Sequence, residues 1–327
     1  MQYTNLGRSG LKVSRLCLGT MNFGRATPEK DAFATMDKAL ESGITFFDTA
    51  NVYGGPDRRG LTEEIVGRWF ALGGGRRESV VLATKVYNPM DEPLDGPNDA
   101  RGLSAYKIRR SLARSLKRLQ TDHIELYQMH HVDRTVSWDE LWGAFQPIVD
   151  SGVVDYIGSS NFGARHLCYA QAAAKDRHFL GLVSEQHKFS LACRWPELEV
   201  LPTAEDLGLG ILCWSPLGGG LLSGHALNPE WGGRTAEAAQ HLSAAQRAQV
   251  QAYAKLCREI GASESAVALA WLLGHQAVTA PIIGPRTPDQ VTSAVAALDV
   301  TLTEDVSGQL DAIFPGPGGP APEAYAW

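Results

Sequence analysis

The stretch Arg15-Leu-Cys-Leu-Gly19-Thr-Met-Asn-Phe-Gly24 decides between two α/β folds. Its first five residues are expected to form a short apolar strand. A doubly wound sheet normally follows its first strand with the pattern G-x-G-x-x-G. Here the residues after Gly19 do not have that spacing. The stretch therefore argues against a doubly wound sheet, and the order of the other elements has to identify the alternative.

Seven further short apolar runs follow along the chain, each bounded by glycine, proline or polar residues. Strands of a parallel sheet, which helices cover on both faces, have this composition and length. Together with residues 15–19 they make eight expected strands, the other seven being residues 45–48, 80–84, 124–129, 156–159, 182–185, 210–214 and 279–283.

Helical patterns separate these strands. The first opens at Thr27 and Pro28, a capping residue followed by a proline suited to the first helical position. The helix after the third expected strand starts at Ser104, and Ser137 is the expected cap of the helix after the fourth. Strict alternation, without a linker or a shift in composition, predicts one domain over residues 1–327. The expected fold is α/β, a single (β/α)₈ TIM barrel with long rim loops and a C-terminal tail.

Three stretches are longer than ordinary connections, namely residues 87–103, 215–242 and 315–327. The first two follow expected strands, which places them at the C-terminal rim, where barrel enzymes carry their active sites. The third is a tail rich in proline and glycine. We expect it either to be flexible or to fold over the mouth of the pocket through Tyr325 and Trp327.

Composition excludes several classes of protein. The chain has 327 residues, with 30 Lys+Arg and 36 Asp+Glu, and the net charge of −6 argues against a strongly basic nucleic-acid binder. The start of the chain lacks a signal peptide pattern, and the longest apolar run, residues 266–273, is far shorter than the roughly 20 residues that cross a bilayer. The five cysteines form no C-x-x-C pair. We expect a cytoplasmic protein with reduced thiols, bound neither to membrane nor to nucleic acid.

Four polar residues stand at or just after the ends of expected strands: Asp48, Tyr53, Lys85 and His130. In a parallel barrel these strand ends meet at one face. A buried ammonium at Lys85 would lower the pKa of a neighbouring phenol, and Asp48 would supply the carboxylate that a buried cation needs. His130 can hydrogen-bond the oxygen of a bound carbonyl. The joint pattern predicts an acid–base site, although each residue alone is more often structural.

The sequence resembles the aldo-keto reductase superfamily from about Leu6 to Ala297. The stretches Asp48-Thr-Ala-Asn-Val-Tyr53-Gly, Ala83-Thr-Lys85 and Tyr127-Gln-Met-His130 are similar to the Asp, Tyr, Lys and His tetrad of that family. The resemblance implies carbonyl reduction in which Tyr53 is the general acid, Lys85 and Asp48 adjust its acidity, and His130 positions the carbonyl. Hydride then comes from a reduced nicotinamide.

The resemblance also implies a set of cofactor-binding residues. Gly19, Thr20 and Met21 would line the nicotinamide riboside beside Asp48, and Trp214 would stack on the nicotinamide. The carboxamide would bind Ser160, Asn161 and Gln186. The pyrophosphate would bind the loop of Ser215, Pro216, Leu217, Gly219 and Gly220, because glycines let backbone N–H groups approach oxygens closely. The adenosine end would bind Gly284, Arg286 and Gln290.

The resemblance to this family leads us to expect NADPH. A guanidinium at Arg286 suits a 2′-phosphate, which NADH lacks. The chain departs from related reductases at His225, where they often carry a lysine in the pyrophosphate loop.

The substrate is expected to be a small carbonyl compound. Residues 63–70, 73–77, 130–134, 138–140 and 156–161 resemble the actinobacterial reductases of deoxysugar pathways. That likeness suggests the hypothesis of a nucleotide-linked keto-6-deoxyhexose, reduced at C3. Cationic and aromatic residues of the rim loops are candidates to contact such a substrate: Arg101, Arg194, Trp195, Trp231 and Arg234.

Three other functions remain open at this stage. A broad-specificity aldehyde or ketone reductase would have the same tetrad in a looser pocket. A regulatory protein that binds NADPH, similar to channel β-subunits, would share the fold and the Trp-Ser-Pro-Leu loop. A metal-dependent hydrolase could use His123, His130 and His131, but adjacent residues of a strand point to opposite sides and no further His/Asp pair completes a site, so we expect no metal. The oligomeric state is open; Trp69 and Phe70, if exposed, would suit a subunit contact.

Overall fold

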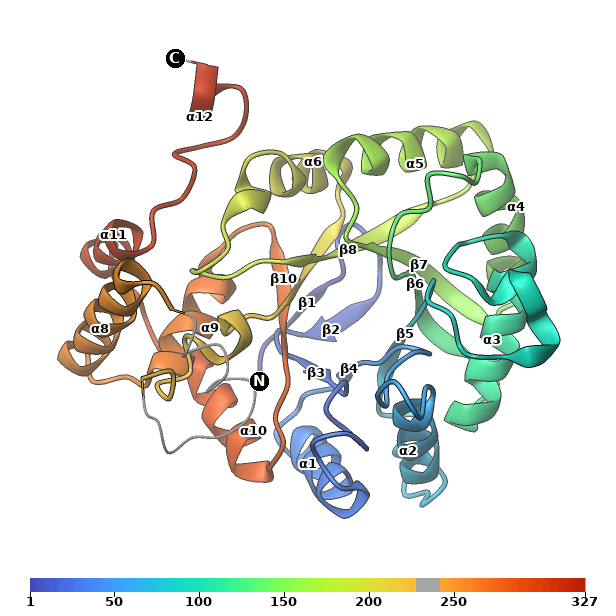
Figure 1. The fold of residues 1–327 in the computed structure, drawn as a ribbon, viewed down its shortest axis with the longest axis horizontal. Helices are drawn as coiled ribbons and strands as arrows, with labels where there is room; N and C mark the ends of the chain where they lie inside the picture. Colours follow the sequence, from blue (N-terminus) through green and yellow to red (C-terminus); the bar gives the residue numbers. More distant parts are fainter. Residues whose placement is uncertain (228–241, 327) are drawn as a thin grey trace.

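Eight parallel strands close into a barrel in the computed structural model, which describes residues 1–227 and 242–326 (Figure 1). The expected (β/α)₈ architecture is thereby confirmed. Around the barrel each strand pairs with its neighbours in the order β10-β3-β4-β5-β6-β7-β8-β9. The strands are β3 (Cys17–Gly19), β4 (Phe46–Asp48), β5 (Val81–Val86), β6 (Ile124–Met129), β7 (Val154–Ser160), β8 (Leu182–Lys188), β9 (Gly210–Trp214) and β10 (Val278–Ile283).

Helices surround the barrel on its outer side (Figure 1). Those that follow the strands are α1 (Glu29–Glu41), α2 (Leu61–Phe70), α3 (Ala105–Leu119), α4 (Trp138–Asp150), α5 (Ala164–Asp176), α6 (Val200–Leu207), α9 (Glu264–Gly274) and α10 (Pro288–Val295). Shorter or additional helices are η1 (Pro93–Asp99), η2 (Trp195–Glu197), η3 (Gly218–Gly220), α8 (Ala244–Glu259), η4 (Ala296–Asp299), α11 (Glu304–Ile313) and α12 (Glu323–Ala326). Within the described part of the chain, none of the helices combines the length and the apolar character needed to cross a membrane.

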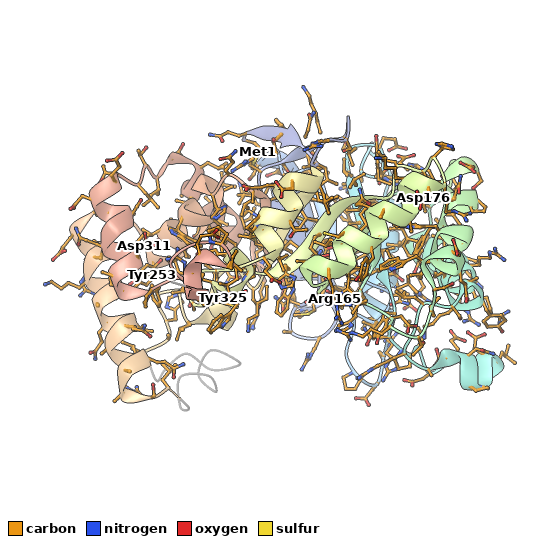
Figure 2. The ribbon with its side chains drawn as sticks, turned by 90° about the horizontal axis from the view of Figure 1, so that it is seen from above. Met1, Arg165, Asp176, Tyr253, Asp311 and Tyr325 are labelled. Carbon is orange, nitrogen blue, oxygen red and sulfur yellow. The ribbon has the colours of Figure 1, made fainter. Side chains whose placement is uncertain are left out.

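Side-chain caps fix the start of several helices. The hydroxyl of Ser104 accepts a hydrogen bond from the backbone of Lys107, and that of Ser137 accepts one from Glu140, as expected for N-caps. The start of α1 differs from the prediction by one residue, because Pro28 occupies the N-cap position and the helix begins at Glu29. Figure 2 shows Arg165 and Asp176 at opposite ends of α5, with Met1 toward the Asp176 end.

The core has two layers. Inside the barrel, apolar side chains of different sizes pack together, including Cys17, Phe46, Ala83 and Leu126. The hairpin of β1 (Tyr3–Asn5) and β2 (Lys12–Ser14) adds to this cluster, because the flanking Leu6 and the strand residue Val13 are fully buried with it. The hairpin therefore closes one end of the barrel, so an active site can open only at the opposite end. A larger apolar cluster fills the space between the strands and the helices.

The idea that Trp69 and Phe70 form an exposed contact surface is wrong. Trp69 is 0% exposed and Phe70 is buried as well. The indole of Trp69 stacks on Phe47 of β4, with ring centroids 5.7 Å apart, and its N–H donates to Asp37 over 2.9 Å. Both aromatic rings thus face the strands, where they contribute buried apolar area rather than a subunit contact.

The tail does not cover the pocket over its described part. Residues 315–326 end in α12, which Figure 1 shows at the end of an extended stretch of chain, apart from both α11 and α6. The backbone N–H of Ala321 donates to the carbonyl of Leu198 over 2.8 Å, and Arg194 donates to the carbonyl of Phe314 over 3.0 Å. These contacts direct the tail along η2 and α6. Trp327 lies outside the described residues.

Candidate active site

A cleft of about 580 Å³ opens at the C-terminal ends of the barrel strands. It brings together every residue that the sequence assigned to catalysis or cofactor binding, except Lys85, which lies directly beneath it. Those that line the cleft are Gly19, Thr20, Met21, Asp48, Tyr53, His130, Ser160, Asn161, Gln186, Trp214, Ser215, Pro216, Leu217, Gly219, Gly220, Gly284, Arg286 and Gln290. The strand ends therefore place these distant segments around one cavity.

A buried ion pair forms the base of the site. The ammonium Nζ of Lys85 lies 2.5 Å from Oδ1 of Asp48 and donates a second hydrogen bond to the carbonyl of Thr49 over 2.9 Å. The two side chains are 0% and 3% exposed, so each charge depends on the other for compensation. Although burial lowers the pKa of Lys85, the charge of Asp48 and the hydrogen bonds to Asp48 and Tyr53 outweigh it and leave that pKa raised. Lys85 is therefore a permanent cation under physiological conditions.

The phenol of Tyr53 is the third member of this group. Nζ of Lys85 lies 3.2 Å from its hydroxyl oxygen, close enough for a direct hydrogen bond. Burial raises the pKa of Tyr53 above its ordinary value, and Lys85 opposes that shift without overcoming it. The expectation that the pKa of Tyr53 is lowered overall is therefore wrong. Lys85 does lower that pKa, as expected, but by less than burial raises it. A phenol that stays protonated at neutral pH can give up its proton when charge develops on a substrate.

His130 contacts the edge of this phenol. The rings of Tyr53 and His130 are 5.8 Å apart and nearly perpendicular, at 80°. Burial lowers the pKa of His130 to about 3, with the nearby charge of Lys85 as the second cause. The imidazole is therefore neutral at physiological pH and has one N–H to donate. Its Nδ1 is buried and has no hydrogen-bond partner within the described protein.

Gln128 is a member of the site that sequence reasoning did not single out. Its Nε2 donates to Oδ2 of Asp48 over 3.0 Å, and Gln186 donates to the same oxygen over 2.9 Å. The two amides thus hold the oxygen of Asp48 that Lys85 leaves unbound. The signal was present, because a polar residue two positions before His130 in an apolar strand points to the same side.

The expected carboxamide site is built around Asn161. Its backbone has φ = 61°, a left-handed conformation that is uncommon outside glycine. Its Nδ2 donates to the carbonyl of His130 and to the hydroxyl of Ser160, while its Oδ1 accepts from the indole N–H of Trp214 over 3.1 Å. Asn161 thus connects the ends of β6, β7 and β9. Ser160, Gln186 and Trp214 border the same region of the cleft.

The expected pyrophosphate loop has an open backbone. Gly218, Gly219 and Gly220 all have positive φ, between 59° and 105°. A Cβ placed on Gly219 would meet nothing within 4 Å, so the space above it is free. The backbone N–H of Gly218 donates to the carbonyl of Ser215 and that of Gly220 donates to the carbonyl of Leu217, so Gly219 is the position of this loop where a ligand oxygen can approach the backbone closely. Gly19 has a different reason to be glycine, since a Cβ there would lie 2.7 Å from Ile282 of β10.

The far end of the cleft holds Arg286 and Gln290. The side-chain Oε1 of Gln290 accepts the backbone N–H of Arg286 over 2.7 Å, which fixes the turn before α10. The cleft is also lined by polar residues that the sequence analysis did not assign to cofactor binding, namely Ser223, His225, Ser265 and Ser293. Amide donors at one end, open glycine backbone in the middle and a guanidinium at the other end fit an extended nicotinamide dinucleotide.

The three proposed rim contacts that the structure describes, Arg101, Arg194 and Trp195, do not line the cleft. Arg194 pairs with Glu197 and Asp311 and lies over the ring of Trp271. Trp195 is 75% exposed, and Arg101 is also exposed away from the lining residues. Trp231 and Arg234 lie outside the described residues. In residues 1–227 and 242–326, no group of three or more His, Cys, Asp or Glu side chains is arranged to hold a metal ion.

Comparison with known proteins places the chain in a family of oxidoreductases. The sequence profile described as "Aldo/keto reductase family" matches residues 15–314. The chain is 61% identical to "Uncharacterized oxidoreductase YrpG" of Bacillus subtilis over the whole of both proteins. It is 33% identical to "Probable voltage-gated potassium channel subunit beta" of Oryza sativa, covering 96% of each chain. It is 30% identical to "Putative aryl-alcohol dehydrogenase AAD16" of Saccharomyces cerevisiae, covering 93% of this chain and 94% of the relative.

Proposed function

Because the chain belongs to the aldo/keto reductase family of NAD(P)H-dependent oxidoreductases, we propose that it is an NADPH-dependent carbonyl reductase with Tyr53 as its general acid. One observation carries this proposal. The phenol of Tyr53 borders the cleft, and the ammonium of Lys85 lies 3.2 Å from its oxygen. A proton donor and the cation that stabilises its conjugate base therefore meet where a carbonyl compound can enter.

Each residue of the tetrad has a distinct task in this mechanism. When bound, NADPH would supply hydride to the carbonyl carbon of the substrate. As negative charge develops on the carbonyl oxygen, Tyr53 donates its proton to that oxygen, and the resulting phenolate is stabilised by the charge of Lys85. Asp48 keeps Lys85 charged through their ion pair. His130, neutral at physiological pH, donates an N–H to the same carbonyl oxygen and orients it.

NADPH is proposed over NADH on the chemistry of the far end of the cleft. Arg286 is half-buried there, beside Gln290 and Ser293. A guanidinium offers several donors in a planar fork that matches a phosphate group. The 2′-phosphate of NADPH would be its partner, and NADH has no group of that charge.

The substrate is proposed to be a small aldehyde or ketone, and a nucleotide-linked keto-6-deoxyhexose is the more specific candidate. The sequence likeness to deoxysugar reductases is the only support for that candidate. The cationic and aromatic rim residues that were to contact such a sugar are either paired elsewhere, exposed or outside the described residues. The names of the relatives given above mention an oxidoreductase and an aryl-alcohol dehydrogenase. Simple carbonyl compounds therefore come first in the test.

The test is the oxidation of NADPH and, in parallel, of NADH, followed at 340 nm. The panel contains aliphatic aldehydes, aromatic aldehydes, α-diketones and a nucleotide-linked keto-sugar. We expect turnover of at least one carbonyl class, with NADPH the more efficient cofactor. If the protein binds NADPH but reduces none of the carbonyl compounds in the panel, its assignment as a reductase is wrong.

A regulatory role is the second candidate, and the relative named as a probable potassium channel β-subunit favours it. Such a protein would bind NADPH tightly and reduce no member of the panel at a measurable rate. The same assay combined with cofactor titration therefore separates the two functions. The tetrad and the open cleft are the reasons to place the reductase first.

A further inference from the structure

Glu185 is a fully buried acidic residue that the mechanism above does not use. It lies on β8 between Ser184 and Gln186 and is 0% exposed. Gln186 points into the barrel, where it donates to Asp48. Neighbouring residues of a strand face opposite sides, so Glu185 points away from the barrel interior, behind the cleft. A buried carboxylate is costly unless hydrogen bonds compensate it, and its partners therefore indicate its purpose.

Three groups bind this carboxylate. The backbone N–H of Phe162 donates to Oε1 over 2.9 Å, and the hydroxyl of Ser159 lies 2.5 Å from Oε2. Nδ1 of His187, near the rim, lies 3.1 Å from Oε1. Two of these groups belong to one short segment, residues 159–162, which leaves the end of β7. Glu185 thus holds this segment at both ends.

The two residues between these anchors line the cleft. They are Ser160 and Asn161, which the proposed function places at the carboxamide of the nicotinamide. Asn161 has φ = 61°, a left-handed conformation that asparagine tolerates better than most residues and that its hydrogen bonds to Gln186 and His130 fix here. The backbone N–H that follows Asn161, that of Phe162, is the one that Glu185 accepts. The bond therefore lies next to the left-handed residue.

We propose that Glu185 is a positioning residue: by binding Ser159 and Phe162 it holds Ser160 and Asn161 in the conformation that receives the nicotinamide end of the cofactor. The inference rests on the proposed function, because it assumes that a nicotinamide binds in this cleft. Glu185 does not touch the cofactor. It acts through the backbone of the β7 segment, and its effect is confined to the nicotinamide end.

The test compares two ligands by isothermal titration calorimetry. NADP⁺ contains both ends of the cofactor, whereas adenosine 2′,5′-bisphosphate contains only the adenosine end. Glu185→Gln removes the charge and replaces one of the two acceptor oxygens with an NH₂ group, and we expect NADP⁺ to bind about tenfold more weakly. The bisphosphate should bind within a factor of two of the wild-type affinity. A variant with general structural damage would lose affinity for both ligands.

A second variant covers the case in which Glu185→Gln does not fold. Ser159→Ala removes one partner and keeps the carboxylate with its bond to Phe162. We expect a loss of about threefold for NADP⁺, smaller than for Glu185→Gln, and none for the bisphosphate. Equal loss for both ligands, or no loss for NADP⁺ in either variant, would overturn the role of Glu185.

Glu63 offers a matched control. It is also fully buried, and it also accepts a hydroxyl, that of Thr84, over 2.6 Å. It lies on α2, outside the cleft lining. Glu63→Gln should lower thermal stability while both ligands keep their affinities. If the wild-type chain binds neither NADP⁺ nor NADPH, the proposed function falls together with this inference. If it binds them and Glu185→Gln binds equally well, only the inference falls.

Discussion

Two buried ion pairs lie on opposite faces of strand β5. Lys85 points into the barrel and pairs with Asp48. The preceding residue, Thr84, points outward, and its hydroxyl donates to Glu63 of α2, which pairs with Arg118 of α3 over 2.8 Å. Both carboxylates are almost completely buried. Consecutive residues of one strand therefore support two pairs of similar chemistry in different surroundings.

The surroundings of each ion pair determine its function. The outer pair is enclosed between α2, α3 and the barrel wall, next to the fully buried Tyr127, whose pKa is raised by burial and by the charge of Glu63. The inner pair lies beneath an open cleft and contacts the phenol of Tyr53. A buried charge in a closed environment can only contribute to stability or specificity. The same charge beside a protonated group and an entrance can stabilise a reaction.

The largest expected effect is that of Tyr53→Phe. Removing the phenol oxygen takes away the proposed proton donor, and we expect kcat for carbonyl reduction to fall about 10³-fold. The ring remains, so the affinity for NADPH, measured by titration, should stay within a factor of three. If the variant keeps its turnover and its pH profile, the inner ion pair does not act through Tyr53 and does not differ from the outer pair in function.

Arg118→Met should have a large effect of the opposite kind. It leaves the carboxylate of Glu63 buried without its cation, and we expect the free energy of unfolding to fall by about 3 kcal/mol. Urea denaturation measures this loss. The kcat of the folded fraction should not change, since the outer pair does not touch the cleft. A fall in kcat at full folding would show that the two faces of β5 are coupled.

The smallest effect concerns the pH dependence of stability. The pKa of His130 is lowered to about 3 in the folded protein, so the unfolded chain binds a proton that the native chain does not. Stability is therefore lost as the pH falls below the ordinary pKa of histidine. The expected slope approaches about 1.4 kcal/mol per pH unit. His130→Asn should lack this contribution in urea denaturation between pH 6.5 and 5. Equal slopes for both proteins would contradict a buried, neutral His130.

The candidate site was predictable where it depended on strand ends. Asp48, Lys85 and His130 end apolar runs, and the geometry of a parallel barrel then requires them to meet at one face. The contact between Lys85 and Tyr53 confirms the predicted proximity. The net pKa of Tyr53 was not predictable, because it depends on how completely the surroundings exclude water, which no local pattern records.

Other features depended on contacts between distant segments. Glu185 has its role only through Ser159 and Phe162 on another strand. The same holds for Gln128, whose partner Asp48 is 80 residues away in the chain. Trp69 looked available for a subunit contact, but its burial follows from the packing of α2 against Phe47. Spacing within a segment does not contain such information.

The order of apolar runs and helical patterns determined the barrel, and the polar residues at strand ends determined which side chains could react. These properties depend on short stretches of sequence or on the alternation of strands and helices, so they can be predicted from the sequence. Tertiary structure alone decided the protonation of Tyr53 and His130, the left-handed Asn161 and its support by Glu185. Burial and the distance between charges arise only when strands close around one axis, and these two quantities set the energies of the site.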